Sequence, residues 1–83
     1  MYFVYILFNS KTNKYYIGST ERPEARLKHH NSGSTPSTKA GAPFWEIKYL
    51  EELPNRSEAL KRELEIKRKK SRKYIEWLIY SPG

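Results

Sequence analysis

Residues 2–8, with the sequence YFVYILF, form an unbroken run of β-branched and aromatic side chains, which favour a β-strand. Successive side chains of a strand point to opposite faces of the sheet, and in this segment both alternating sets are apolar. A strand that is apolar on both faces is covered on both sides, as the central strands of a sheet are. We therefore predict that this segment is the central strand of a sheet with helices packed on its faces.

Two further strands are expected. Residues 14–18 follow after a short, turn-rich link, which predicts an antiparallel hairpin with the first strand. Residues 45–50 alternate between aromatic or aliphatic and charged side chains over most of their length, which predicts a third strand. With the first strand in the centre, the sheet order is 2-1-3. The predicted fold class is α/β of the α+β type, with a three-stranded antiparallel sheet flanked by about three helices in a single domain over residues 1–83.

The helices are predicted from capping residues and from helical periodicity. Thr20 is the expected N-cap of the first helix, and Pro23 is tolerated in its first turn. Ser57 and Ser71 are the expected caps of the second and third helices. The predicted helices end near His30, near Lys70 and before the last three residues.

The composition excludes several classes of site. The chain has 83 residues and no cysteine, so it has neither a disulfide framework nor a thiolate zinc site. All nine acidic residues are glutamate, which excludes EF-hand loops and two-metal sites built on clustered aspartates. The opening apolar run is far shorter than the ~20 residues of a membrane span. We therefore expect no membrane attachment and a cytoplasmic location.

The positive charge is concentrated in one segment. The net charge is +7, and residues 56–73 hold nine basic residues against three glutamates. Such a cluster attracts polyanions and makes their binding salt-dependent, so nucleic acid is the first expected partner. A helix whose charges serve only as a solvated surface is the alternative. The run from Lys67 to Lys73, with six basic residues in seven, favours contact with phosphates.

Glu63 occupies an unusual position on the second helix. With about 100° per residue and Ala59 at zero, Glu63 lies near 40°, in the middle of a stripe formed by Ala59, Leu60, Leu64 and Ile66. A carboxylate that faces the protein body needs a cation, a metal or a strong hydrogen-bond donor. A buried pair with an arginine or a tyrosine is the structural alternative to a metal ligand.

Two other groups of polar and aromatic residues have functional and structural interpretations. Arg26 and His30 are four residues apart on the first helix and share a face, where they either act on a ligand or are simply solvated. Tyr5 and Tyr16 lie on the two strands of the hairpin, and we expect them side by side or one residue offset. Core packing is the commoner role of such tyrosines, although each buried hydroxyl still needs a partner.

Together these residues resemble the GIY-YIG nuclease family. The segments Val4–Ile6 and Tyr16–Gly18 resemble its paired motif, with Val4 in place of the first glycine. Residues 26–31, RLKHHN, resemble the Arg-Leu-x-x-His-Asn stretch of the first helix, and residues 58–63, EALKRE, resemble the Glu-Ala-Leu-x-x-Glu stretch whose last glutamate holds the metal. Thr38 and Lys39, with Pro43 and Tyr49, resemble the intervening segment of small members. The resemblance covers residues 2 to about 79.

The resemblance implies a metal-dependent endonuclease that hydrolyses phosphodiester bonds in DNA. Glu63 would hold Mg²⁺ or Mn²⁺, and Arg26 would bind the scissile phosphate. Tyr5 is the first candidate for the general base, with Tyr16 positioning water or phosphate and His30 as the rival base. The residues expected to contact nucleic acid are Arg26, Lys39, Lys67, Lys69, Lys70, Arg72 and Lys73.

The alternatives are a non-catalytic nucleic-acid-binding module on the same fold and a docking domain for an acidic protein. About 80 residues leave no room for a second reading unit, so we expect little intrinsic sequence specificity. A homodimer or a separate specificity protein could supply it. A role in DNA repair fits the residues, as do recombination and mobile-element roles.

Overall fold

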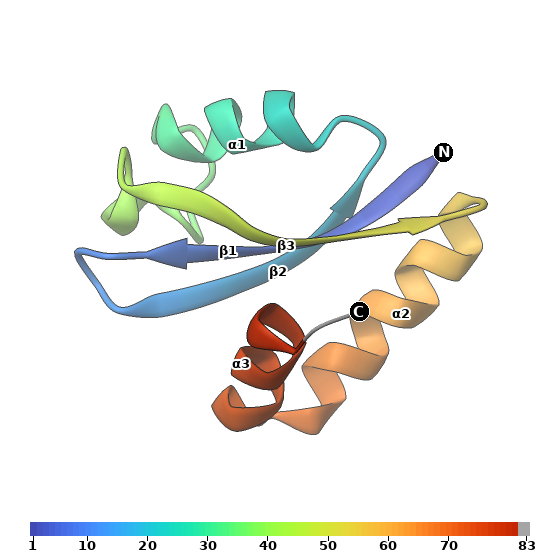
Figure 1. The fold of residues 1–83 in the computed structure, drawn as a ribbon. Helices are drawn as coiled ribbons and strands as arrows, with labels where there is room; N and C mark the ends of the chain where they lie inside the picture. The colour runs from blue at the N-terminus through green and yellow to red at the C-terminus, as the bar shows by residue number, and fades with distance from the viewer. Residues whose placement is uncertain (82–83) are drawn as a thin grey trace.

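The computed structural model describes residues 1–81, so residues 82–83 of the predicted domain lie outside the described part. It has an α+β fold with a three-stranded antiparallel sheet in the order β2-β1-β3, as predicted (Figure 1). Helix α1 covers one face of the sheet, and α2 and α3 cover the other (Figure 1). None of the helices in residues 1–81 has the length and apolar character to span a membrane. The elements are β1 (Tyr2–Asn9), β2 (Lys14–Thr20), α1 (Pro23–Asn31), the 3₁₀ turn η1 (Lys39–Gly41), β3 (Trp45–Leu53), α2 (Arg56–Lys69) and α3 (Arg72–Tyr80).

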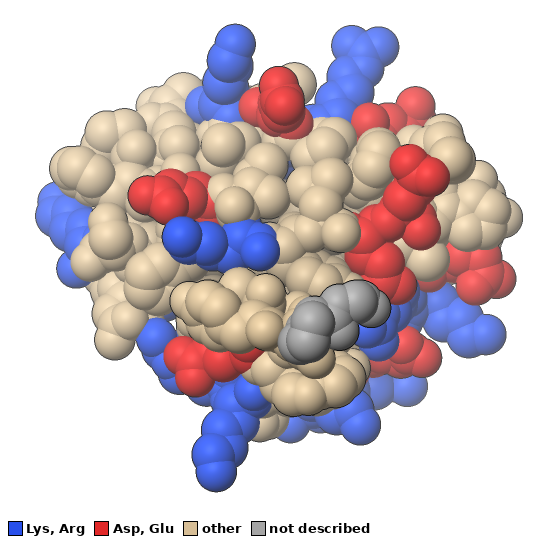
Figure 2. Space-filling view, viewed as in Figure 1, with Lys and Arg blue, Asp and Glu red and all other residues tan. Residues whose placement is uncertain are grey.

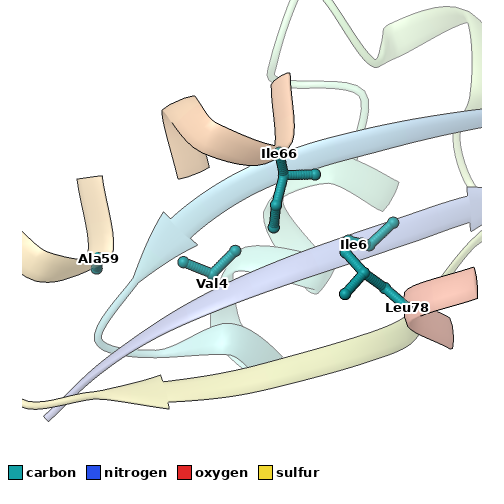
Figure 3. Close-up of a cluster of buried hydrophobic side chains, with 5 residues drawn as sticks. All are labelled: Val4, Ile6, Ala59, Ile66 and Leu78. Carbon is teal, nitrogen blue, oxygen red and sulfur yellow. The ribbon is translucent and has the colours of Figure 1, made fainter. Parts of the chain in front are cut away.

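Strand β1 separates two hydrophobic clusters, which confirms the prediction from its two apolar faces. Val4 and Ile6 pack with residues of α2 and α3 on one side, where Ala59, Ile66 and Leu78 complete the cluster (Figure 3). Tyr5 and Leu7 pack on the other side with Trp45. Burial of each large aliphatic side chain contributes about 1.5–3 kcal/mol, so β1 anchors both layers of the fold.

The hairpin between β1 and β2 differs from the predicted register. Its centre lies between Lys11 and Thr12, and Tyr5 is opposite Gly18 while Tyr16 is opposite Leu7. The two tyrosines are therefore two residues out of register, and the prediction of one residue or less was wrong. They still share the face that α1 covers, because an offset of two residues preserves the alternation of the strand.

A buried asparagine fixes the turn of this hairpin. Asn9 is 0% exposed, and its side-chain oxygen accepts hydrogen bonds from the backbone N–H groups of Lys11 (3.0 Å) and Thr12 (2.9 Å). Its amide donates to the carbonyl of Gly41 at 2.6 Å, which ties the turn to η1. All polar groups of the Asn9 side chain are thus paired, which is what burial of an amide requires.

Two of the predicted helix caps were wrong. Thr20 belongs to β2, and the residue before α1 is Arg22, whose side chain makes no capping bond. Helix α2 begins two residues earlier than expected, and its cap is Asn55, which accepts from the Glu58 N–H at 2.9 Å, rather than Ser57. The Ser71 cap of α3 is confirmed by its bond from the Tyr74 N–H at 3.1 Å.

The buried face of α2 is narrower than its apolar residues indicated. Ala59 and Ile66 are buried, whereas Leu60 is 43% and Leu64 is 49% exposed. The space beside Ala59 and Ile66 is taken by Arg62, whose guanidinium pairs with Glu51 of β3 at 3.0 Å. Leu60 and Leu64 therefore do not belong to the stripe that faces the sheet.

Candidate active site

Helix α1 lies on one face of the sheet and α2 on the other (Figure 1). The motif residues converge near the edge strand β2. Tyr5 projects on the α1 side, opposite Gly18. Ser19, the next residue of β2, is on the α2 side and bonds to Glu63. The end of β2 thus lies between the tyrosine–histidine half of the site and its carboxylate half.

On the α1 side, three side chains form a buried hydrogen-bonded chain. The Tyr5 hydroxyl lies 3.0 Å from His30 Nε2, and His30 Nδ1 lies 2.8 Å from Thr38 Oγ1. The Thr38 hydroxyl lies 3.4 Å from the carbonyl oxygen of Thr35, to which it donates, so it accepts from His30 Nδ1–H. His30 then carries its proton on Nδ1, and its Nε2 accepts the proton of Tyr5.

Gly18 is required by the path of the Tyr5 side chain. A Cβ at residue 18 would lie 2.5 Å from the Tyr5 hydroxyl oxygen and 2.6 Å from the ring carbon that bears it. Any larger residue would displace the hydroxyl from His30. Gly18 therefore leaves the space that the Tyr5 side chain occupies. This contact across the hairpin was not predicted, because the predicted register was wrong.

Burial and nearby charges shift the pKa values of this pair in opposite directions. Burial raises the pKa of Tyr5, a hydrogen bond donated by Arg26 lowers it, and the nearby Tyr16 raises it again. Burial lowers the pKa of His30 below its ordinary 6.5, and the positive charges of Arg26 and His29 lower it further. At neutral pH the pair therefore consists of a protonated tyrosine and a neutral imidazole.

Tyr16 and Asn31 hold this half of the site in place. The Tyr16 ring lies 4.8 Å from the His30 ring and 6.3 Å from the Tyr5 ring, measured between centroids. Asn31 bonds to both backbone groups of Trp45, accepting from its N–H at 2.9 Å and donating to its carbonyl at 3.0 Å. The end of α1, and with it His30, is thereby fastened to the start of β3.

On the α2 side, Glu63 has one hydroxyl partner and one cationic partner. Ser19 donates to Oε1 at 2.7 Å, and Lys67 donates to Oε2 at 2.6 Å, while the Glu63 side chain is 14% exposed. The expected alternative of a pair with arginine or tyrosine was wrong, because the cation is a lysine one helical turn away. The negative charge of Glu63 is close enough to contribute to the raised pKa of Tyr5, although it is a lesser cause than burial, Tyr16 and Arg26.

The chemistry of these donors fits a magnesium ion, although the described residues contain no group of three acidic or histidine side chains around one point. Mg²⁺ keeps several waters and commonly takes one or two carboxylates together with substrate phosphates. Glu63 supplies one carboxylate with the Ser19 hydroxyl beside it. A single protein carboxylate is therefore sufficient for a metal that the substrate helps to hold.

A hollow of about 620 Å³ opens beside Ser19 and Arg26. Arg22, His29 and Arg56 also line it, so three arginines border one space. Arg22, Arg56 and Ser19 were not among the predicted site residues. The charge run that begins at Arg56 was a signal for that residue, whereas only the fold brings Arg22 and Ser19 to the same hollow.

The predicted phosphate contacts are distributed over a wider surface. In Figure 2, lysine and arginine side chains project from the lower edge of the molecule, where α2 and α3 lie in Figure 1. Lys39 lies apart from them, in η1. Lys69 lies over the Tyr74 ring at 5.4 Å, and Lys73 is exposed on α3. The structure therefore brings together Tyr5, Tyr16, Arg26, His30 and Glu63 but not the whole set of predicted basic contacts.

Comparison with known proteins identifies a family. A family model described as the GIY-YIG catalytic domain matches residues 1–75 of the chain. No curated protein and no solved structure gives a significant match. The matched segment covers most of the chain and contains every residue of the site.

Proposed function

The chain belongs to the GIY-YIG catalytic domain family, and we propose that it is a divalent-metal-dependent endonuclease that hydrolyses phosphodiester bonds in DNA with little intrinsic sequence specificity. The family match confirms the resemblance of the motifs and implies a nuclease-type fold. The observation that carries the proposal is the oriented chain Tyr5–His30–Thr38 beside Arg26. A module that only binds nucleic acid needs basic side chains, and it has no use for a buried proton acceptor beside them.

In the proposed reaction, Tyr5 and His30 act as one base. Both side chains are buried, with His30 at 0% and Tyr5 at 2% exposure, and the Tyr5 hydroxyl lies beside Arg26, which lines the hollow. As the oxygen of a water molecule bonds to the phosphorus atom and the bond between phosphorus and the leaving oxygen breaks, the water passes one proton to the Tyr5 oxygen, and the tyrosine passes its own proton to His30 Nε2. Because the pKa of Tyr5 is raised, this coupled transfer avoids a standing phenolate at neutral pH.

Arg26 and Glu63 serve the phosphate in this scheme. Arg26, an exposed residue that lines the hollow, binds the scissile phosphate and stabilises the negative charge that grows in the transition state. Glu63, with the Ser19 hydroxyl beside it, would hold Mg²⁺ or Mn²⁺. When bound, such an ion stabilises the leaving oxygen and neutralises phosphate charge. Tyr16 packs on Tyr5 and His30 and keeps both rings in position.

Metal-dependent nicking is the direct test of the proposal. Purified protein incubated with supercoiled plasmid is expected to produce nicked circles in Mg²⁺ or Mn²⁺ and none in excess chelator. Branched and single-stranded DNA are tested in parallel, because a nuclease without a sequence reader can still require a particular structure. Salt-sensitive binding to all of these substrates without cleavage of any would contradict the proposal and support the non-catalytic binding module.

The Arg26→Ala variant is expected to lose cleavage by about 10²–10³-fold, as enzymes do when a donor to the transition state is removed. Lys28→Ala is the matched control, because it removes one positive charge from an exposed residue of the same helix that does not line the hollow. Single-turnover nicking at saturating protein separates the rate of cleavage from binding. An equal, small loss in both variants would show that Arg26 contributes only to the general positive field.

A further inference from the structure

A second groove, of about 370 Å³, lies between the edge of β2 and the junction of α2 and α3. Its lining combines apolar side chains with a basic rim: Tyr15, Ile17, Ile66 and Ile75, with Lys14, Lys67, Lys70 and Arg72. The groove adjoins the candidate active site. Ile17 precedes Ser19 by two residues and is on the same face of β2, and Lys67 is the residue that pairs with Glu63 at 2.6 Å.

Arg72 in this groove is not available for a phosphate. Its Nη1 and Nη2 donate to the backbone carbonyl and side-chain oxygen of Asn13, each at 2.8 Å, and its Nε donates to Glu76 at 3.3 Å. The predicted role of Arg72 as a phosphate contact therefore has no support in its hydrogen bonding. The guanidinium lies 4.8 Å from the Tyr15 ring centroid, and its side chain is 47% exposed. What it offers a ligand is a fixed, flat and cationic surface.

The lysines of the groove have the opposite character. Lys14 and Lys70 are exposed, and neither has an ion-pair partner within residues 1–81. Lys70 is held in the left-handed conformation at the end of α2, with φ at 46°. Both ammonium groups are therefore free for an anion at the rim of an otherwise apolar groove.

We propose that this groove binds an unpaired nucleotide of the DNA strand that enters the active site, with Lys14 and Lys70 contacting phosphates and Arg72 stacking on the base. Bases stack on aromatic rings and on guanidinium planes in single-strand sites, and the phosphates beside them are held by lysines. The base of a duplex is already stacked on its neighbours, so the groove selects a flap, gap or other single-stranded segment. This inference rests on the proposed function, and it names the substrate class.

The helix gives the distance between the groove and the cleaved bond. Lys70 follows Glu63 by seven residues on α2, which corresponds to roughly 10 Å along the helix axis. At the spacing of about 3.4 Å per nucleotide in a duplex, this is about three steps of one strand, and a more extended single strand takes fewer. The stacked base is therefore expected within about three nucleotides of the scissile phosphate.

The test uses binding in chelator, so that its outcome does not depend on cleavage. The probes are a fluorescent single-stranded oligonucleotide, the same strand with one abasic site moved along its length, and a blunt duplex. The abasic strand keeps every phosphate and loses one base. We expect an abasic site at the bound position to weaken binding roughly tenfold, the scale of one base stacked on a side chain. Equal affinity for all abasic strands would overturn the stacking role.

Two variants assign the contacts to residues. Arg72→Lys keeps the positive charge and removes the planar guanidinium group. This variant should bind the intact strand as weakly as the wild type binds the abasic strand. Its affinity should not change when the abasic site is introduced. Arg68→Lys is the matched control on the outer face of α2. Circular dichroism shows whether loss of the bonds to Asn13 unfolds the Arg72 variant. If it does, the abasic scan on the wild type decides whether a base is stacked in the complex.

The double variant Lys14→Gln/Lys70→Asn tests the phosphate contacts, with asparagine chosen because it tolerates the left-handed conformation. The slope of log affinity against log salt should become shallower by about 1.4 for single-stranded DNA, which corresponds to two lost contacts. The control Lys28→Gln/Lys61→Gln removes the same charge from exposed positions outside the groove. Equal slopes in the two double variants would overturn the phosphate role of Lys14 and Lys70.

Discussion

The Glu63→Gln variant is expected to fold and to bind DNA as the wild type does, and to lose cleavage by about 10²–10³-fold or more. The substitution keeps the shape of the side chain and an oxygen that can accept from Ser19, so the contact between α2 and β2 survives. It removes the charge that pairs with Lys67, which is 47% exposed and can be solvated instead, so the cost to stability is about 0–1 kcal/mol. A neutral amide is a poor ligand for a hard divalent cation, and the loss therefore falls on the reaction.

Glu58→Gln is the matched control for this variant. It makes the same substitution on the same helix, at an exposed residue whose backbone N–H, rather than its carboxylate, bonds to Asn55. Isothermal titration of both variants with Mn²⁺ in the presence of a non-cleavable oligonucleotide gives a readout independent of turnover. Nicking by Glu63→Gln at the wild-type rate would rule out Glu63 as the metal ligand.

The sheet could be predicted because strand order depends on a local property. Both faces of β1 are apolar, and only the central position of a three-stranded sheet buries both. The caps and the α2 stripe were predicted less well because they depend on competition between neighbours. Thr20 extends β2 instead of capping α1. Leu60 remains exposed because Arg62, which forms an ion pair with Glu51, takes the place beside the sheet. Hydrophobic periodicity treats each leucine alike and cannot detect such a competitor.

The site divides in the same way. The positions of the five candidate residues singled them out, the resemblance of the motifs supplied their roles, and the helical periodicity placed Glu63 on the side of α2 that faces the protein body. Their mutual relations were not predictable, because they depend on the hairpin register, on the contact between Ser19 and Glu63, and on the loop over residues 32–43. Thr38 comes from that loop and sets the tautomer of His30, and no local pattern in the sequence marks a threonine as a partner for a histidine eight residues away. The sequence left Tyr5 and His30 as rival bases, whereas their 3.0 Å separation makes them partners in the proposed reaction.

Removal of the Tyr5 hydroxyl in Tyr5→Phe is expected to reduce cleavage by about 10²–10⁴-fold, the contribution of a positioned general base. The ring still packs with Leu7 and Trp45, so the fold is retained. His30 Nε2 is left without its partner, which costs about 1–3 kcal/mol of unfolding free energy. Tyr49→Phe is the matched control, because it removes a hydroxyl that donates to Glu51 at 2.6 Å, away from the site. If both variants lose cleavage only to the extent that they lose stability, Tyr5 is a structural residue.

Tyr5 and His30 also determine how cleavage depends on pH. Burial, Arg26 and His29 all lower the pKa of His30, so the imidazole stays neutral and able to accept the tyrosine proton until the pH falls below 6.5. Wild-type cleavage should therefore be level through neutral pH and fall only at acidic pH, as His30 becomes protonated. A fall centred at or above 6.5 would contradict the proposed role of His30.

Folding stability depends on the same protonation, and the two effects have to be separated. A histidine whose pKa is lower in the folded than in the unfolded state contributes its full stability above the unfolded value, about 6.5, and loses it as the pH falls toward the folded value. Circular dichroism at each pH identifies the range in which the protein remains folded. Within that range, we expect the wild type to lose cleavage as the pH falls, and the residual cleavage of Tyr5→Phe to stay level. Such a difference would assign the pH dependence to the transfer of a proton from Tyr5 to His30, because only that transfer requires both side chains.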